Sequence, residues 1–292
     1  MEVAWHITKD DLNDFPDGLL KKLGVVNEKL DALDPKLEAV LSNPRRIYVG
    51  DEFCLTRMPD IKGIAEFILF ADKKDLALTL LTPVLTDQGI EHCTALFDRL
   101  YQWDSTTEVV VNDLGVLFFL KKNYPGFHLS MGRLFNKGFK DPRLGNEDRK
   151  ASGLMAGLLN DCSFNHENIQ VLAQSLGVQG FEQDLLPYAD PAGVGTSRLK
   201  TAVYLPFGYV TTGRACFTAG LNQTSDTRFR LNGRCSLPCA THSLELKSPD
   251  LAFKLFQNGN TIFYLYTLSM IRTLLEKAQQ QKIRLVYQGG LI

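Results

Sequence analysis

The chain lacks long apolar runs and lacks an excess of charge of either sign. No uninterrupted apolar stretch approaches the ~18 residues that a membrane-spanning helix needs, so no membrane span is expected. Lysine and arginine number 32 against 33 aspartates and glutamates, which leaves a formal net charge of −1. This balance argues against a nucleic-acid-coating or polybasic membrane-binding protein, although a local basic pocket is compatible with it. The 292 residues are 45% hydrophobic, which is ordinary for a globular protein that builds its core without staples.

The sequence also lacks a secretory signal and two common hydrolase motifs. Residues 1–15 carry early acids and no apolar segment of the kind that a secretory signal contains. Six cysteines in a chain without such a signal do not predict a secreted disulfide framework, so we expect a cytoplasmic protein. The sequence contains neither H-E-x-x-H nor G-x-S-x-G, so zinc-protease and serine-hydrolase mechanisms lack their motifs.

Short apolar strands alternate with helical patterns along most of the chain. Strands are expected at 46–50, 76–85, 108–111, 127–131, 178–181 and 201–209, and helices at 61–70, 88–103, 114–122, 168–176 and 265–281. Such alternation predicts a parallel sheet with helices on its faces. The length fits a closed or distorted TIM-like (β/α) barrel better than an open doubly wound sheet. The expected fold class is therefore α/β, with a single TIM-like barrel domain.

The first 44 residues differ from the remainder in charge. Residues 10–44 contain few bases and carry the acids Asp10, Asp11, Asp14, Asp17, Glu28, Asp31, Asp34 and Glu38. The simplest interpretation of this segment is a pair of solvated surface helices. We therefore expect an acidic N-terminal region at 1–44, followed by the barrel domain at 45–292.

Four of the six cysteines stand where a ligand site is expected. Cys235 and Cys239 form a C-x3-C pair in a loop with glycine and proline, which suits turning two thiolates toward one point. Cys54 and Cys216 each follow an expected strand. The C-terminal ends of barrel strands gather on one face, so all four thiolates could meet there. Four soft thiolates suit either zinc or an iron–sulfur cluster, and spacing alone does not separate the two.

The other two cysteines match no ligand pattern. Cys93 lies within an apolar helical stretch, and neither it nor Cys162 matches the pattern of the other four cysteines. Free cysteine often packs as a small hydrophobic residue. We expect both to be core thiols.

Several short segments resemble the collagenase-like peptidase family U-32. They are YLPFGYVTTGRACFTA at 204–219, NGRCSLPC at 232–239, IYVGDEFCLTR at 47–57, VNDLGVL at 111–117 and VQGFE at 178–182. Their order and spacing agree with the family from about residue 45 to residue 270. Within the family they are most similar to the iron–sulfur branch that acts in ubiquinone biosynthesis.

This resemblance implies a [4Fe–4S] cluster on Cys54, Cys216, Cys235 and Cys239. It also implies oxygen-independent hydroxylation of an aromatic or quinone precursor, in a complex with a second protein of the same family. Other family members are implicated in hydroxylating RNA bases, so RNA is a lesser alternative substrate. Residues 217–234 look like an insertion relative to the family, and this departure leaves the substrate open.

Three further residues are candidates for the same site. Arg57 and Arg214 lie within three residues of a ligand cysteine, where a guanidinium could bind an acidic substrate or hydrogen-bond near cluster sulfurs. The alternative for both is a rim arginine paired with an acid. Glu182 ends an expected strand, and we expect it to line the mouth. Asp113 is expected to cap the helix that begins at Leu114.

Two other functions remain open from sequence. A peptidase of the U-32 type is one, although no nucleophile–base pair is found. A non-catalytic, zinc-stabilised binding module is the other, and it predicts a colourless protein whose fold depends on zinc. If the cluster forms, cysteines fill all four positions, so electron transfer or structural support is more natural than Lewis-acid chemistry.

Overall fold

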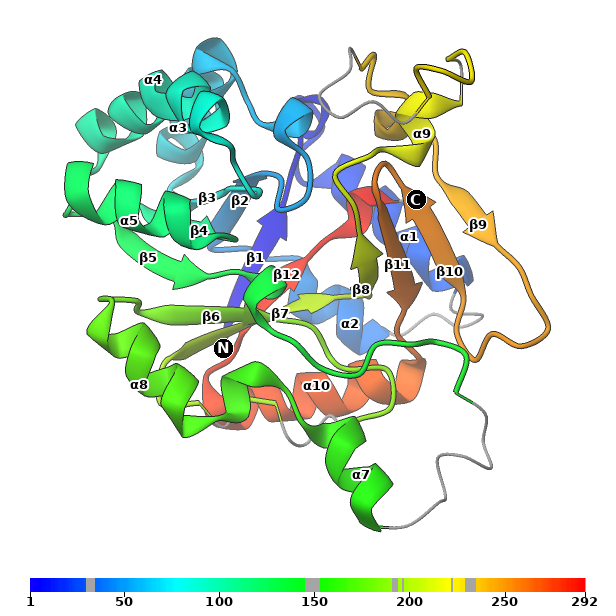
Figure 1. Ribbon diagram of the computed structural model, residues 1–292. Helices are drawn as coiled ribbons and strands as arrows, with labels where there is room; N and C mark the ends of the chain where they lie inside the picture. Colours follow the sequence, from blue (N-terminus) through cyan, green and yellow to red (C-terminus); the bar gives the residue numbers. More distant parts are fainter. Residues whose placement is uncertain are drawn as a thin grey trace.

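Eight parallel strands close into a barrel (Figure 1). The computed structural model describes residues 1–29, 35–144, 153–190, 194–195, 197–221, 223–228 and 235–291. The barrel order is β1-β12-β7-β6-β5-β4-β3-β2. The strands are β1 (Glu2–His6), β2 (Arg46–Gly50), β3 (Ala77–Leu81), β4 (Glu108–Val111), β5 (His128–Met131), β6 (Gly180–Gln183), β7 (Lys200–Leu205) and β12 (Arg284–Tyr287). The prediction of an α/β, TIM-like barrel is confirmed.

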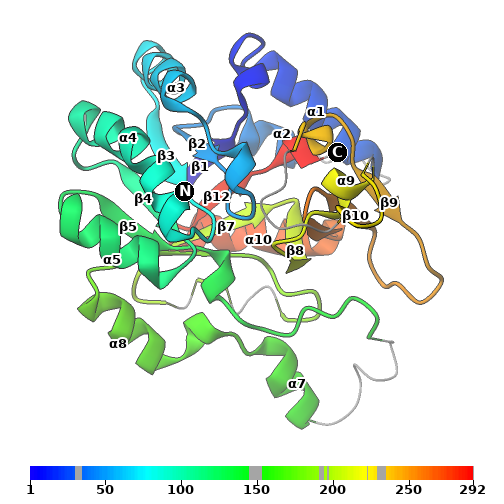
Figure 2. The ribbon, with the colours of Figure 1, turned by 45° about the horizontal axis from the view of Figure 1, so that its top comes forward.

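Helices lie around the outside of the barrel, and α7 projects away from it (Figure 2). They are α1 (Asp17–Lys29), α2 (Pro35–Leu41), α3 (Ile61–Lys74), α4 (Asp87–Trp103), α5 (Leu114–Asn123), α7 (Gly153–Asn160), α8 (Glu167–Ser175) and α10 (Leu268–Gln281). The starts of α3, α4, α5 and α10 are each capped by a side chain that accepts a backbone N–H three residues on; the caps are Asp60, Thr86, Asp113 and Thr267. The expected capping role of Asp113 is confirmed. Within the described ranges, no helix is long and apolar enough to cross a bilayer.

The first barrel strand, β1, lies within residues 1–44, which were expected to form a region separate from the barrel. Strand β1 pairs with β12 on one side and with β2 on the other, so it closes the barrel. The boundary at residue 45 is therefore wrong. Only three consecutive residues of β1, Val3 to Trp5, are buried, and a run this short carries little periodic signal. Helices α1 and α2 do follow, but they bury Leu23, Val26, Leu37 and Leu41.

The expected strand at 201–209 is two strands in two different sheets. Strand β7 ends at Leu205, and β8 (Phe207–Thr212) starts a second, antiparallel sheet of order β8-β11-β10-β9. Its other strands are β9 (Leu244–Leu246), β10 (Leu255–Asn258) and β11 (Thr261–Leu265). Pro206 separates β7 from β8 and has no N–H to donate to a ladder. The second sheet is thus an insertion in the connection between β7 and α10, and Figure 1 shows it beside the barrel.

The barrel interior is polar toward the amino-terminal ends of the strands. Tyr48 donates a hydrogen bond to Glu182 Oε1 at 3.0 Å, and Arg284 donates to the Tyr48 oxygen at 2.7 Å. Arg284 also pairs with Glu108 and, at 2.9 Å, with Glu2. The second oxygen of Glu182 is buried and has no hydrogen-bond partner among the described residues. Burial raises the pKa of Glu182 to about 8, and the charge of Glu108 adds to the rise.

The pKa of Glu182 makes stability depend on pH in a defined direction. Its carboxyl binds a proton more tightly in the folded chain than in the unfolded chain, where a pKa near 4.5 applies. The free energy of unfolding should therefore fall as pH rises from about 4.5 to 8. In the Glu182→Gln variant, which keeps an acceptor for Tyr48, this contribution should be absent. Between pH 5 and pH 8, wild type should lose roughly 2–4 kcal/mol relative to the variant in urea titrations. Parallel curves for the two proteins would contradict this.

Candidate functional site

Four cysteines line one pocket at the C-terminal face of the barrel. They are Cys54, Cys216, Cys235 and Cys239, and the pocket has a volume of about 130 Å³. Its walls come from the loops that follow β2 and β3 and from the insertion after β7. The structure thus brings together all four cysteines that the sequence singled out. Cys93 and Cys162 are buried elsewhere, as expected of core thiols.

Side-chain and backbone hydrogen bonds hold the first two cysteines. After β2, the backbone N–H groups of Phe53 and Cys54 donate to Asp51 Oδ1 at 2.7 and 2.8 Å, which folds the loop tightly. Cys216 precedes the short helix α9 (Phe217–Gly220), and its Sγ accepts the backbone N–H of Ala219 at 3.4 Å. An N–H donor of this kind stabilises negative charge on a sulfur.

The C-x3-C pair is shaped by one left-handed residue. Leu237 has φ 56°, an uncommon conformation for a residue with a β-carbon, and its N–H donates to Cys235 Sγ at 3.3 Å. The chain then turns into a short 3-10 helix that carries Cys239. Asn258 donates to the Cys239 carbonyl at 3.1 Å. Gly259, with φ +63°, packs beside this cysteine, and a β-carbon there would lie 3.5 Å from its Sγ.

Two of the four thiols in the pocket, those of Cys54 and Cys239, have a raised pKa. Burial raises the pKa of Cys239 to about 11; Arg57 opposes this, and the three other cysteines add to it. Burial and the charge of Asp51 raise the pKa of Cys54. Among the described residues that line the pocket, no histidine, aspartate or glutamate is present to act as a base. Cys54 and Cys239 therefore lack the activation that a cysteine nucleophile requires.

The four thiols of the pocket are candidate metal ligands. In the described part of the chain, no three histidine, cysteine, aspartate or glutamate side chains are placed to hold one metal ion. A single zinc would need each sulfur within about 2.3 Å of the ion. A four-iron cluster spreads its four thiolates farther apart, because irons and sulfides lie between them. The donor set, four soft thiolates with two N–H donors, fits either a zinc ion or an iron–sulfur cluster.

The candidate arginines line this pocket, but Glu182 does not. Arg57 donates to Asn258 at 2.9 Å and pairs with Asp51 at 3.4 Å, so it combines a rim ion pair with a place in the pocket wall. Arg214 lines the same pocket and is exposed. Glu182 points into the barrel and borders a separate cavity at the amino-terminal ends of the strands. The expectation that it lines the cysteine mouth is wrong, because its register on β6 directs it inward.

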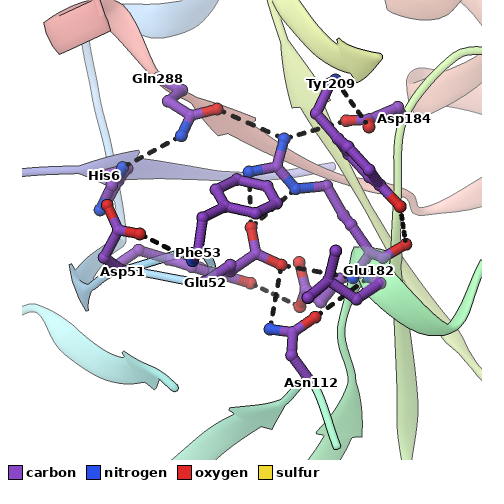
Figure 3. Close-up of polar contacts among 12 residues, drawn as sticks. His6, Asp51, Glu52, Phe53, Asn112, Glu182, Asp184, Tyr209 and Gln288 are labelled. Atoms are coloured by element: carbon purple, nitrogen blue, oxygen red, sulfur yellow. Dashed lines mark hydrogen bonds and ion pairs between the residues drawn. The ribbon is translucent and has the colours of Figure 1, made fainter. Parts of the chain in front are cut away.

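A buried ion network lies beneath the pocket (Figure 3). Arg133, which follows β5, donates from Nε to Glu52 at 2.7 Å and from Nη1 to Asp184 at 3.0 Å. Only 1% of the Arg133 side chain is exposed. Burial opposes its charge, but Glu52 and Asp184 outweigh this effect and raise its pKa. Its guanidinium also stacks 3.7 Å above the ring of Tyr204.

The network joins several strand ends. Gln288, after β12, accepts from Arg133 at 3.4 Å and contacts His6 Nδ1 at 3.5 Å. His6 Nε2 lies 2.8 Å from the carbonyl oxygen of Gly50. Asp184 accepts the backbone N–H of Tyr209 at 3.1 Å, which ties the insertion to the barrel. Sequence reasoning missed this network, although charged residues directly after barrel strands were a usable signal.

A larger cavity adjoins the cysteine pocket. Its volume is about 350 Å³, and it shares Phe53, Thr56, Arg57 and Asn260 with the cysteine pocket. Its wall combines apolar residues with polar and charged ones; they include Ile7, Met58, Phe67 and Phe263, together with His6, Lys9, Asp51, Asp60 and Gln288. This size and lining are typical of a site for a small organic ligand.

Comparison with known proteins gives only distant similarities. No protein-family model matches the chain, and no curated protein matches it in sequence. The solved structure of the U32 peptidase Mk0906 is 13% identical, with a TM-score of 0.37, over 70% of this chain and 69% of that one. A glycoside hydrolase family 18 N-acetylglucosaminidase from Paenibacillus barengoltzii is 8% identical, with a TM-score of 0.40, over 98% and 94% of the two chains.

The spore cortex-lytic enzyme SleL of Bacillus megaterium is likewise 8% identical, with a TM-score of 0.38, over 100% of this chain and 71% of that one. All three scores are below 0.5. The likenesses therefore add nothing to what the strand pairings of this chain already show about its barrel.

Removal of the Arg133 guanidinium should lower the free energy of unfolding. In Arg133→Met, Glu52 and Asp184 remain buried without their counter-charge, so the free energy of unfolding should drop by roughly 3–5 kcal/mol. Arg143→Met is the matched control, because Arg143 pairs with Asp141 on the surface and its loss should leave the urea midpoint unchanged. Equal midpoints for the two variants would show that the network does not hold the barrel end together.

Proposed function

We propose that Cys54, Cys216, Cys235 and Cys239 hold a [4Fe–4S] cluster and that the chain is the redox subunit of an oxygen-independent hydroxylase. The observation that carries this proposal is the meeting of four cysteines in one pocket. Three of them come from the insertion after β7, and one comes from the loop after β2. A cluster there would join the insertion to the barrel.

The sequence resemblance supports the kind of reaction. Within family U-32 the cysteine pattern is similar to that of UbiV, which acts with UbiU on a ubiquinone precursor. By this resemblance the substrate is an aromatic or quinone precursor, and the partner is a second, UbiU-like protein. The adjoining cavity of about 350 Å³ has the size that such a substrate needs, and its wall offers both apolar contacts and polar groups.

The residues around the pocket have definable tasks. Each thiol must lose its proton to become a ligand, so binding should release protons and weaken at low pH. The N–H groups of Ala219 and Leu237 stabilise the resulting charge on Cys216 and Cys235. Arg57 brings a positive charge to Cys239, and it also borders the larger cavity. When bound, the cluster supplies one-electron transfer.

In the proposed reaction, Arg57 orients the acidic end of a substrate in that cavity. Phe53, which lines both pockets, separates the substrate from the cysteines and excludes water from between them. The imidazole of His6, which is partly buried, lies in the same wall, and burial lowers its pKa. His6 therefore offers a neutral hydrogen-bonding group at neutral pH rather than a second charge.

The hydrolytic alternative receives no support from the pocket. A cysteine peptidase needs a thiolate held by a neighbouring base, and the described lining residues contain no histidine, aspartate or glutamate. The raised pKa values of Cys54 and Cys239 point the same way. A zinc module remains as the alternative that metal analysis must exclude.

Anaerobic purification with metal analysis tests the proposal. We expect a brown protein with about four irons and about four sulfides per chain and a broad visible absorption band. A colourless protein with about one zinc would contradict the proposal and favour the zinc-stabilised module.

Cysteine variants locate the ligands. Cys54→Ser should lose most of the iron, because this thiol is the sole ligand from the barrel loop. Cys162→Ala is the control: its thiol is buried away from the pocket, so iron and sulfide counts should equal those of wild type. Full iron content in Cys54→Ser would remove this residue from the ligand set.

A further inference from the structure

The segment that carries three of the cysteines is basic, in a chain whose net charge is −1. Between residues 213 and 241 the sequence has four arginines against one acid; they are Arg214, Arg228, Arg230, Arg234 and Asp226. Arg230 and Arg234 lie outside the described residues. The acid is engaged locally, since a hydrogen bond from Thr224 lowers the pKa of Asp226. Positive charge is thus concentrated next to the cysteines.

Three arginines surround the pocket opening. Arg57, Arg214 and Arg228 all line it, and no acid does so among the described residues. Arg214 and Arg228 are exposed and form no ion pair with a described residue. Arg228 packs on α9, where a β-carbon at Gly220 would lie 2.8 Å from the Arg228 Cγ. This close approach holds its stem against α9, beside the cysteines.

Large apolar side chains are exposed around the same opening. Leu55 and Val84 line the pocket, and Phe217 and Leu221 lie on and directly after α9. We name the whole set the cysteine rim; its members are Leu55, Arg57, Val84, Arg214, Phe217, Leu221 and Arg228. Arginine and aromatic residues among apolar neighbours are typical of protein–protein interfaces. The aliphatic members offer nucleic-acid bases nothing to stack on, so the mixture favours a protein over RNA.

We propose that the cysteine rim docks the acidic face of a small electron-carrier protein. This inference rests on the proposed function. The pocket volume of about 130 Å³ is too small for an organic electron donor beside a cluster. The electron must then arrive across a protein surface: the carrier loses one electron, the cluster gains it, and no bond or proton changes place. Small, electrostatically steered interfaces are usual for such encounters.

Charge reversal at the rim tests the docking. The probe is a reduced, acidic plant-type [2Fe–2S] ferredoxin, mixed anaerobically with the holoprotein in a stopped-flow instrument at low and high salt. In the double variant Arg214→Glu/Arg228→Glu, the second-order rate of reduction at low salt should fall roughly tenfold or more. The wild-type rate should itself fall steeply with salt.

Arg198→Glu is the matched control. This exposed arginine precedes β7, at the opposite end of the barrel, and pairs with Glu167 at 3.6 Å. Its rate should stay within about twofold of wild type, because Arg198 lies at the opposite end of the barrel, outside the proposed docking face. Equal rates for wild type and the double variant, or a salt-independent wild-type rate, would overturn the docking proposal.

Two measurements separate this inference from the proposed function. Iron and sulfide counts, together with complete reduction by excess dithionite, establish the cluster in every variant. Should wild type hold no cluster, the proposed function fails, and binding of oxidised ferredoxin by calorimetry still reports on the rim. Loss of that binding in the double variant would support docking, and unchanged binding would overturn it. Binding of a 20-nucleotide polyadenylate through the same arginines, without ferredoxin binding, would also overturn it.

Discussion

The guanidinium of Arg133 is enclosed at the C-terminal end of the barrel between the carboxylates of Glu52 and Asp184. A charge at this depth is stable only when it is paired, so the three side chains must take up one arrangement together. Glu52 stands two residues before Cys54, and Asp184 also holds the backbone of Tyr209 at the start of the insertion. One ion cluster therefore positions both chain segments that supply cysteines.

The insertion is tied to the barrel a second time, at the pocket itself. Asn260, in the turn between β10 and β11, donates to the carbonyl of Phe53 at 2.7 Å, and Arg57 donates to Asn258 at 2.9 Å. These contacts join the loop after β2 to the tip of the small sheet. They explain how residues about 200 positions apart in sequence can form one pocket, and why the cysteine site and the larger cavity share a wall.

The parts of the fold that sequence predicted are those governed by local interactions. Helices α3, α4 and α5 combine an apolar face with an Asp or Thr cap, and each begins within one residue of its expected start. Strand β2 has the expected bounds. Strand β1 was missed because its place depends on the distant strands with which it pairs, whereas the break at Pro206 was a signal in the sequence that the expected strand at 201–209 overlooked. Residue type and spacing carry little information about such pairing.

The candidate site also combines features that the sequence predicts with features that only the tertiary structure decides. Sequence alone determined that four cysteines, two of them in a C-x3-C loop, stand apart from two core thiols, and that arginines accompany them. Tertiary structure decided that the four share one pocket and that Glu182 belongs to the barrel interior. The tertiary structure also placed Arg133 between Glu52 and Asp184 at the C-terminal end of the barrel. The physical reason is that spacing constrains only neighbours along the chain, whereas strand register and the pairing of buried charges are set by residues far apart in sequence.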